Sequence, residues 1–342
     1  MTLPPAAAAY RRISYFRLTT ASVTAVGKTL LSAQRPTTPF HGSRRYYSDQ
    51  LNHDPRLKDL EKEIHDEYAA LRDHYATPKH PVVLAHGLLG FSELNVAGGW
   101  LPAIHYWWGI ADALKANGIE VITASVPPSG SIEQRAEKLA KDIAQFAPGK
   151  QVNIIAHSMG GLDARYMVSH LQPENVHVRS LVTIASPHQG SSFADYLFDE
   201  IGTDSLPTVY KFVEGIGMDT GAFKQLTRKY MVEKFNPDTP DDPNVRYFSY
   251  GAKTDLPPFL SPFRQSHRII THVEGANDGL VSVESSKWGK YQGTLVGVSH
   301  LDLINWTNRL RWTLRKFVGI EPHFNAIAFY LAVADMLAKE DL

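Results

Sequence analysis

One short stretch of sequence decides the fold: Val152-Asn153-Ile154-Ile155-Ala156-His157-Ser158-Met159-Gly160-Gly161. Its first half is an apolar run typical of a buried strand, and a helix-compatible segment at residues 162–171 follows directly. A turn this sharp lifts the hydroxyl of Ser158 clear of both elements and leaves it at a helix N-terminus. Ala156 and Gly160 stand two residues to either side of the serine, where only small residues let a strand and a helix approach closely.

This arrangement resembles the nucleophile elbow of the α/β-hydrolases, G-x-S-x-G, with Ala156 at the position of the first glycine. The alternative is that Ser158 only caps a helix, since serine is favoured there for structural reasons. A serine hydroxyl is a weak nucleophile until an adjacent base activates it and a third group orients that base. The elbow interpretation therefore requires an acid and a histidine elsewhere in the chain.

Two downstream segments supply these groups. In α/β-hydrolases the acid follows the serine along the chain and the histidine comes last. Residues 268–273 have the character of a strand, and the tight turn after them contains Asp278, whereas His300 precedes a helical pattern at residues 303–318. An Asp-Gly turn is also common for purely structural reasons, and the chain has 15 histidines, so both residues are chosen by order and context. We expect Ser158, Asp278 and His300 to form a catalytic triad.

A further strand-like run at residues 82–85 leads into His86-Gly87-Leu88. A His-Gly pair at this place lets the backbone turn so that an N–H points at a developing oxyanion. By resemblance to the α/β-hydrolases, the backbone N–H groups of Leu88 and Met159 would form the oxyanion hole, and His86 would be structural rather than catalytic.

Six motifs between about residues 80 and 318 resemble, in the same order, those of true bacterial lipases. They are His86-Gly87-Leu88 and the segments YWWGI (106–110), AHSMGG (156–161), SPHQGS (186–191), NDGLV (277–281) and HLD (300–302). With its N-terminal segment, the chain resembles most closely the fungal mitochondrial triacylglycerol lipases. The resemblance implies a lipase that hydrolyses acylglycerols or other lipid esters through an acyl-enzyme and needs no cofactor. A phospholipase or lipid acyltransferase on the same triad, and a non-catalytic lipid-binding module, are the alternatives.

The bacterial lipases also suggest a calcium site, in which Asp302 would be a ligand two residues after His300. Calcium needs several oxygen ligands, and Asp255, in a proline-rich loop, is the sole second acid that the sequence suggests. Asp302 fits better as an acid at a helix N-terminus, where the helix dipole favours it. We therefore expect no bound metal.

The charge of the chain is zero overall but unevenly distributed. Residues 1–48 carry seven basic side chains and no acid, whereas the remainder carries 28 basic and 35 acidic ones, which argues against nucleic-acid binding. The N-terminal composition is typical of a mitochondrial presequence, and Arg45-Tyr46-Tyr47-Ser48 resembles a processing site. We expect residues 1–47 to be removed in mitochondria; a basic tail without an address is the alternative. The chain has no cysteine and no apolar run near the roughly 18 residues of a membrane span.

The rest of the chain is expected to form an α/β-hydrolase domain, residues 81–342, after a helical arm at residues 48–80. Apolar residues recur in the arm at spacings of three and four, which predicts an amphipathic helix: Leu57, Leu60, Ile64, Tyr68, Leu71 and Tyr75. Strands and helices then alternate as in a mostly parallel sheet flanked by helices. The expected strands are near 82–86, 120–126, 151–157, 180–185, 245–250 and 268–274, and the expected helices near 104–116, 131–146 and 159–171.

An aromatic-rich stretch at about 191–243 interrupts this alternation. In hydrolases of this kind such an insertion forms a cap, so the resemblance implies an acyl-chain pocket under a mobile lid or under a rigid helical cap. The apolar segment 324–337 is expected to be a core helix, with reversible membrane contact as the alternative.

Overall fold

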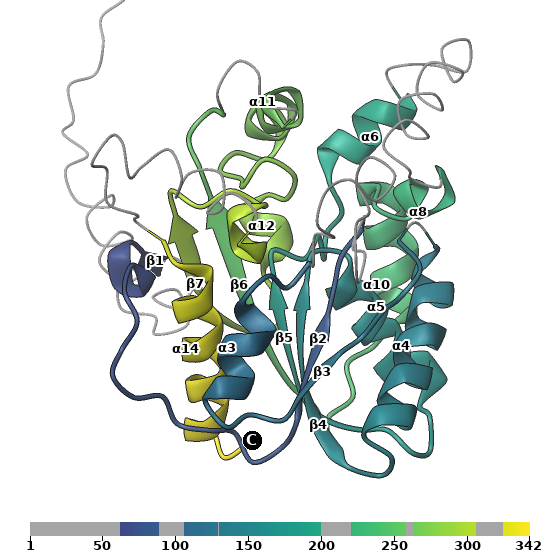
Figure 1. Ribbon diagram of the computed structural model, residues 1–342. Coiled ribbons are helices and arrows are strands. Elements are labelled where there is room, and N and C mark those ends of the chain that lie inside the picture. The colour runs from purple at the N-terminus through teal and green to yellow at the C-terminus, as the bar shows by residue number, and fades with distance from the viewer. Residues whose placement is uncertain (1–61, 89–105, 129, 200–219, 258–262, 306–323) are drawn as a thin grey trace, which may run out of the picture. The chain divides into compact units, whose positions relative to one another are not determined.

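A seven-stranded sheet forms the centre of the fold (Figure 1). The computed structural model describes residues 62–88, 106–128, 130–199, 220–257, 263–305 and 324–342, all within the second of two units, Met1–Ser48 and Asp49–Leu342. The strand order is β1-β7-β6-β5-β4-β2-β3, and every neighbouring pair is parallel. The bounds are β1 Glu63–Ile64, β2 Val82–Ala85, β3 Val121–Thr123, β4 Gln151–His157, β5 His177–Ile184, β6 Arg246–Lys253 and β7 Lys290–Val296. The expected parallel sheet is confirmed.

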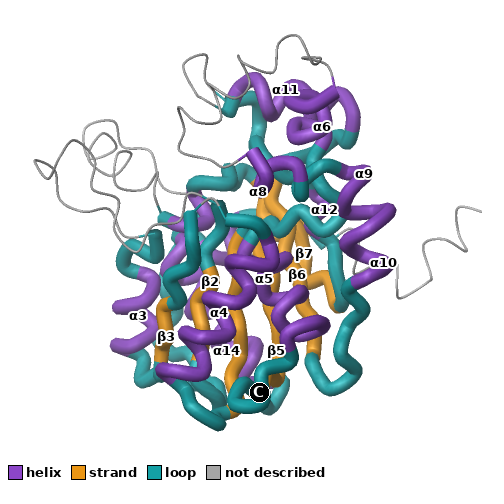
Figure 2. The backbone as a smooth tube through the Cα atoms, turned by 90° about the vertical axis from the view of Figure 1, so that its right-hand side faces the viewer, coloured by secondary structure: helices purple, strands orange, loops and turns teal. Residues whose placement is uncertain are grey.

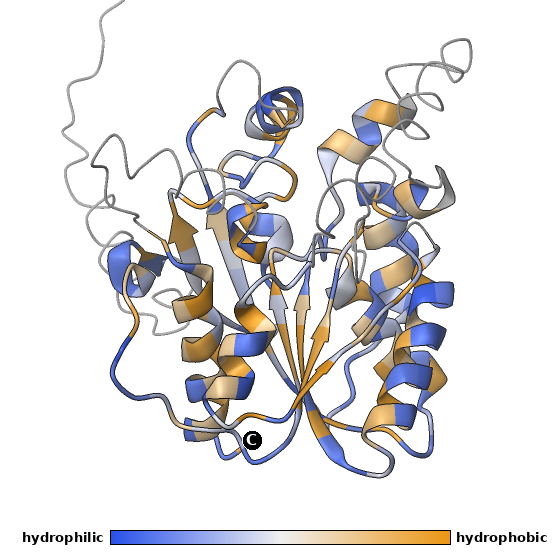
Figure 3. Ribbon diagram, in the orientation of Figure 1, coloured by the Kyte–Doolittle hydropathy of each residue, from blue (hydrophilic) through white to orange (hydrophobic). Residues whose placement is uncertain are grey.

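Helices cover both faces of the sheet (Figures 1 and 2). α3 (Ile110–Ala116) and α14 (Ala326–Lys339) lie on one face, and α4 (Ile132–Phe146) and α5 (Gly160–Tyr166), with its π-helical continuation Met167–Leu171, lie on the other. Both Ile154 and Ile155 of β4 are fully buried, one against each helical layer. A strand with two buried faces is apolar on both of them, and Figure 3 accordingly shows the central strands of the sheet as largely hydrophobic.

The helix boundaries follow local signals in the sequence. Ser131 caps α4 in a capping box: its hydroxyl accepts the N–H of Gln134, and the Gln134 side chain accepts the N–H of Ser131. α3 ends just before Gly118, whose φ of +78° suits glycine. α14 begins directly after Asn325, whose side chain accepts two backbone N–H groups, and its residues are largely buried, so the expected core helix is confirmed.

Two expectations about local structure are wrong. The strand expected near 268–274 is instead the second half of helix α11 (Arg264–Val273) and the residue after it. The β-branched run Ile269-Ile270-Thr271 suggests a strand, but Ser266, His267 and Ile270 are the buried residues, and this spacing is that of a helix face.

The amphipathic helix expected in the arm is also wrong over its described part. Residues 62–75 contain the short strand β1 and a single 3₁₀ turn, Asp66–Tyr68. Pairing of Glu63 and Ile64 with β7 overrides the helical spacing, because an edge strand completes the sheet. β7 itself was not predicted: its sequence is polar for a strand, and Gly293 lies where β1 passes too closely for a side chain.

The described part of the cap is helical and packs inward. It comprises α6 (Ser192–Asp199), α8 (Thr220–Lys224), α9 (Arg228–Tyr230), the π-helical turn Met231–Phe235 and α10 (Asn236–Asp238), whereas residues 200–219 lie outside the described residues. Phe223, Leu226 and Met231 bury their side chains in one apolar cluster with Met159 and Leu162 of the sheet domain. None of the helices in the described ranges is both long enough and apolar enough to traverse a bilayer.

Candidate active site

Ser158 occupies a strained turn between β4 and α5. Its φ is +56°, a left-handed conformation that a residue with a side chain rarely adopts. The turn is held by its own N–H, which donates to the Ile184 carbonyl of β5 at 2.9 Å, and by its carbonyl, which accepts the N–H of Gly161. Ser158 is partly exposed although Met159 and His157 beside it are buried. This is the geometry that the elbow interpretation predicts.

Glycines make the close approach around Ser158 possible. A Cβ on Gly87 would lie 2.6 Å from the Cβ of Ser158 and 3.1 Å from its Oγ. A Cβ on Gly160 would lie 2.6 Å from the carbonyl oxygen of Ala85. The end of β2 therefore passes directly against the elbow, and only glycine fits at both contacts.

Asp278 and His300 form a buried pair. The Oδ2 of Asp278 lies 2.7 Å from the Nδ1 of His300, and the N–H of His300 donates to the Asp278 carbonyl at 2.9 Å. The other carboxylate oxygen, Oδ1, accepts the N–H groups of Leu280 and Val281 at 2.9 and 2.8 Å. With both oxygens engaged, the carboxylate is fixed in place, and it holds the imidazole with Nδ1 toward the acid and Nε2 away from it.

The structure brings this pair to the elbow. The ring of His300 packs on the ring of His157, the residue before Ser158, with centroids 4.5 Å apart. In the described structure no hydrogen bond joins Ser158 to His300. Such contacts are often long without substrate and tighten when it binds. Asp278 reaches this place from a loop that is tied to the end of β6, since Thr254 donates its N–H to the Asn277 carbonyl.

The expected oxyanion donors also lie at the elbow. The N–H groups of Leu88 and Met159 donate to no other residue in the part of the chain that the structure describes. The side chains of both residues belong to the same apolar cluster under the cap. His86 is structural, as expected: its Nδ1 contacts the Gly87 carbonyl and its Nε2 accepts the N–H of Val126. Burial lowers the pKa of His86 to about 4, so the ring stays neutral.

Sequence reasoning missed an ion pair that supports this loop. Arg135 of α4 and Asp163 of α5 are fully buried and form a salt bridge of 2.8 Å. Arg135 also donates to the carbonyls of His86, at 2.7 Å, and of Pro127, at 2.6 Å. The signal was present in the sequence, because Arg135 interrupts the apolar face of α4 between Ile132 and Leu139.

A second contact that sequence reasoning missed comes from Tyr106. Its hydroxyl accepts the N–H of Gly87 at 3.1 Å and lies 2.6 Å from the Nδ1 of His157. Burial lowers the pKa of His157 well below its ordinary value, so this ring is neutral as well. Tyr106 therefore connects the loop of the expected oxyanion donors to the elbow.

The calcium candidate, Asp302, serves the turn that carries His300. Its Oδ2 accepts both the N–H and the hydroxyl of Ser299, at 2.9 and 2.6 Å. Among the described residues no group of three or more His, Cys, Asp or Glu side chains could hold a metal ion. Calcium needs several oxygen ligands, and the described residues do not gather such a set around Asp302.

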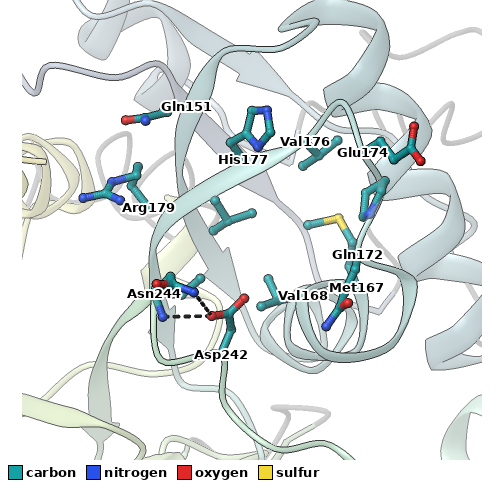
Figure 4. Close-up of a pocket in the computed structure, with 13 residues that line it drawn as sticks. Gln151, Met167, Val168, Gln172, Glu174, Val176, His177, Arg179, Asp242 and Asn244 are labelled. Atoms are coloured by element: carbon teal, nitrogen blue, oxygen red, sulfur yellow. Dashed lines mark hydrogen bonds between the residues drawn. The ribbon is translucent and has the colours of Figure 1, made fainter.

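A separate hollow lies at the end of the strands opposite the elbow, where β4 and β5 begin (Figure 4). We refer to this end of the sheet as its far edge. Its volume is about 450 Å³, and Met167, Val168 and Val176 line it together with the polar residues Glu174, Arg179 and Asp242. Figure 4 shows the Asp242 carboxylate bound to Asn244 beside it. None of the expected site residues lines this hollow, so it is distinct from the site at the elbow.

Comparison with known proteins shows similarity to lipases. The chain is 36% identical to triacylglycerol lipase 2 of Saccharomyces cerevisiae over 313 residues, which cover 78% of this chain and 94% of the relative. It is 29% identical to a triacylglycerol lipase of Vibrio cholerae, over 70% of this chain and 83% of the relative. A family model described as a domain of unknown function (DUF7379) matches residues 59–200.

Solved structures share the fold. The lipase of Staphylococcus hyicus superposes with a TM-score of 0.57 at 21% identity, covering 79% of this chain and 98% of that one. The mature lipase BlEst2 of Bacillus licheniformis superposes with a TM-score of 0.54, also at 21% identity, covering 73% and 96%. At this level of identity the likeness supports the architecture alone.

Proposed function

The chain belongs to the triacylglycerol lipase family, and from this premise we propose that it hydrolyses acylglycerols with Ser158 as the nucleophile. The observation that carries the proposal is the buried Asp278–His300 pair at 2.7 Å, which packs against the strained turn at Ser158. A base oriented by an acid beside an accessible hydroxyl is what acyl transfer to serine requires.

The reaction proceeds in two steps. Ser158 attacks the ester carbonyl while His300 takes its proton, and Asp278 stabilises the imidazolium that forms. The N–H groups of Leu88 and Met159 bind the oxyanion, and one such donor contributes about 3–4 kcal/mol in other enzymes. His300 then protonates the leaving alcohol, and water releases the fatty acid from the acyl-enzyme.

The apolar cluster under the cap supports a long-chain substrate. Leu88 and Met159, the two oxyanion donors, contribute side chains to the same cluster as Phe223, Leu226 and Met231 of the cap. An acyl chain bound to Ser158 therefore has apolar surface within reach on one side of the reacting carbonyl. Since a lipid ester is presented at an interface, the enzyme makes peripheral contact with a lipid surface.

We also propose that the enzyme acts in mitochondria. The support is the N-terminal composition, seven basic residues and no acid in residues 1–48. A fluorescent protein fused to residues 1–48 is expected to enter mitochondria, and a version with Arg11, Arg12 and Arg17 changed to Glu is expected to stay outside. Equal import of both versions into mitochondria would contradict the proposed role of these residues as a mitochondrial targeting signal.

The test of function compares the wild-type chain with Ser158→Ala on emulsified triolein and on phosphatidylcholine vesicles. Fatty acid released from triolein by the wild type alone is the expected result. Release mainly from phosphatidylcholine would retain the mechanism and change the substrate to phospholipid. If neither substrate gives product that depends on Ser158, the lipase proposal is wrong.

A further inference from the structure

Helix α11 is attached to the loops that carry the candidate active site. It lies beyond the carboxyl ends of the strands, beside α6, as Figures 1 and 2 both show. Two contacts on its buried face attach it to the loops of the site: the Ser266 hydroxyl donates to the Gly279 carbonyl at 2.6 Å, and the Nε2 of His267 lies 3.0 Å from the Thr254 carbonyl. Whatever α11 binds is therefore held next to Asp278.

The opposite face of α11 is basic. Arg264, Arg268 and His272 recur every four residues, so they lie along one side of the helix, the basic stripe. Arg268 and His272 are exposed and form no ion pair with any residue in the described ranges. Helix α11 contains no acid, although residues 49–342 as a whole carry more acidic than basic side chains. A local cationic face on an otherwise acidic body gives the molecule a preferred orientation at an anionic surface.

The acidic residues near α11 that the structure describes do not form ion pairs with the basic stripe. Glu274, at the end of the helix, is turned inward and accepts hydrogen bonds from the Ser192 N–H and the Ser282 hydroxyl. Asp255 is exposed in the loop after β6 and forms no ion pair with the stripe in the described part of the chain. Two apolar side chains next to α11 in the sequence are exposed: Val273, its last residue, is 49% exposed, and Leu256, in the loop before it, is 43% exposed. Basic residues beside exposed apolar ones are typical of helices that lie on an anionic membrane surface.

We propose that the outward face of α11 docks on an anionic phospholipid surface and so presents the site to lipid. The inference rests on the proposed function and names the surface through which it operates. Arg268 contacts lipid phosphates, with His272 one turn along the same side of the helix. Arg264 is half-buried and donates to the Pro257 carbonyl, so it adds charge to this face without being the contact itself. The body of the protein, which is net acidic, faces away from the bilayer.

The test uses the full chain and its lack of cysteine. Gln265→Cys introduces a single thiol on the outward face of α11, and Glu174→Cys introduces one beside the hollow at the far edge (Figure 4). Each is labelled with an environment-sensitive NBD dye and titrated with phosphatidylcholine vesicles, with and without phosphatidylglycerol. Emission from position 265 is expected to rise only with phosphatidylglycerol, and emission from position 174 is expected to stay constant.

Charge reversal tests whether the basic stripe is responsible for binding to anionic vesicles. Arg268→Glu is expected to weaken the affinity of the protein for phosphatidylglycerol vesicles about tenfold, as reported by the dye at position 265. The reason is that each basic residue near an anionic surface increases the binding affinity several-fold. Arg268→Gln should lose less, and Arg179→Glu, an exposed arginine at the far edge of the sheet, should lose nothing. Equal signals at both labels, no signal with any vesicle, or an Arg268→Glu variant that binds like wild type would overturn the proposal.

The docking and hydrolysis claims can fail separately. The same titration with Ser158→Ala is expected to be unchanged, because docking needs no chemistry. Binding through the basic residues of 1–48 alone would persist in Arg268→Glu, and that result counts against α11. A protein that hydrolyses triolein but gives no contact at position 265 refutes docking while leaving the proposed activity intact.

Discussion

At the scale of single residues, the site depends on side chains that are absent as much as on those that react. Ser158 is held at a φ of +56° while the backbone of Gly87 passes against it. The small residues around Ser158 and the order of serine, acid and histidine could be read from the sequence, because both follow from local chain geometry. The contacts of Tyr106 could not, since they join residues that lie far apart in the chain.

Gly87→Ala tests this close approach. The added methyl group would lie 2.6 Å from the Cβ of Ser158, so the elbow or the loop must shift. We expect kcat to fall about a hundredfold with the fold retained, because misplacement of a reacting group by about 1 Å costs that much. Gly118→Ala is the control: its methyl group meets no atom within 4 Å, and the strain at its φ of +78° should lower stability without moving the elbow, so kcat should be unchanged. Equal activity of Gly87→Ala and wild type would contradict the described geometry.

At the scale of elements, local signals predicted most of the sheet and failed where long-range pairing decides. β4, α4 and α14 could be read from apolar runs, a capping box and helical spacing. The arm was misread because Ile64 pairs with β7, which lies more than 200 residues away in the chain. The α11 helix was misread because its β-branched residues resemble a strand. Neither error moved Asp278 away from His300, since the loop after α11 is anchored to β6.

The Arg135–Asp163 pair joins α4, α5 and the loop after β2, and its removal is expected to affect all three. Arg135→Met leaves the Asp163 carboxylate buried without its cation, which should cost about 3–5 kcal/mol of unfolding free energy. The double variant Arg135→Met, Asp163→Leu should lose less than the sum of the single changes. Urea unfolding measures both, and kcat should fall because the His86 carbonyl loses its donor.

Lys150 provides the control. It pairs with Glu120 at the surface, where both side chains are about half exposed, so Lys150→Met should cost less than about 1 kcal/mol. If Arg135→Met and Lys150→Met destabilise the protein equally, the buried pair does not support the loop as described.

At the scale of the whole molecule, buried neutral histidines predict that acid destabilises the fold. Burial lowers the pKa of His86 to about 4 and holds the pKa of His157 and His188 well below the ordinary value. The unfolded chain binds protons at these histidines below about pH 6.5, so the stability they contribute is lost as pH falls from there toward 4. Asp163 acts in the opposite direction, since burial raises its pKa to about 6. Three histidines outweigh one carboxyl group.

Urea unfolding at pH 7 and pH 5 measures this balance. The free energy of unfolding should fall on the order of 2 kcal/mol per pH unit near pH 5, the effect of about two net protons. His86→Asn should reduce this slope, because it removes one of the three groups. A stability that is equal at the two pH values, or higher at pH 5, would contradict the burial of neutral histidines.

The most direct test of the central claim is to treat the full chain with a fluorophosphonate and locate the adduct by mass spectrometry. We expect one adduct, on Ser158. It should form much more slowly in His300→Ala and at the wild-type rate in His177→Ala, where the changed residue is an exposed histidine at the far edge of the sheet. An adduct on another serine, no adduct, or labelling that does not depend on His300 would contradict the assignment of Ser158 as a nucleophile activated by His300 and Asp278.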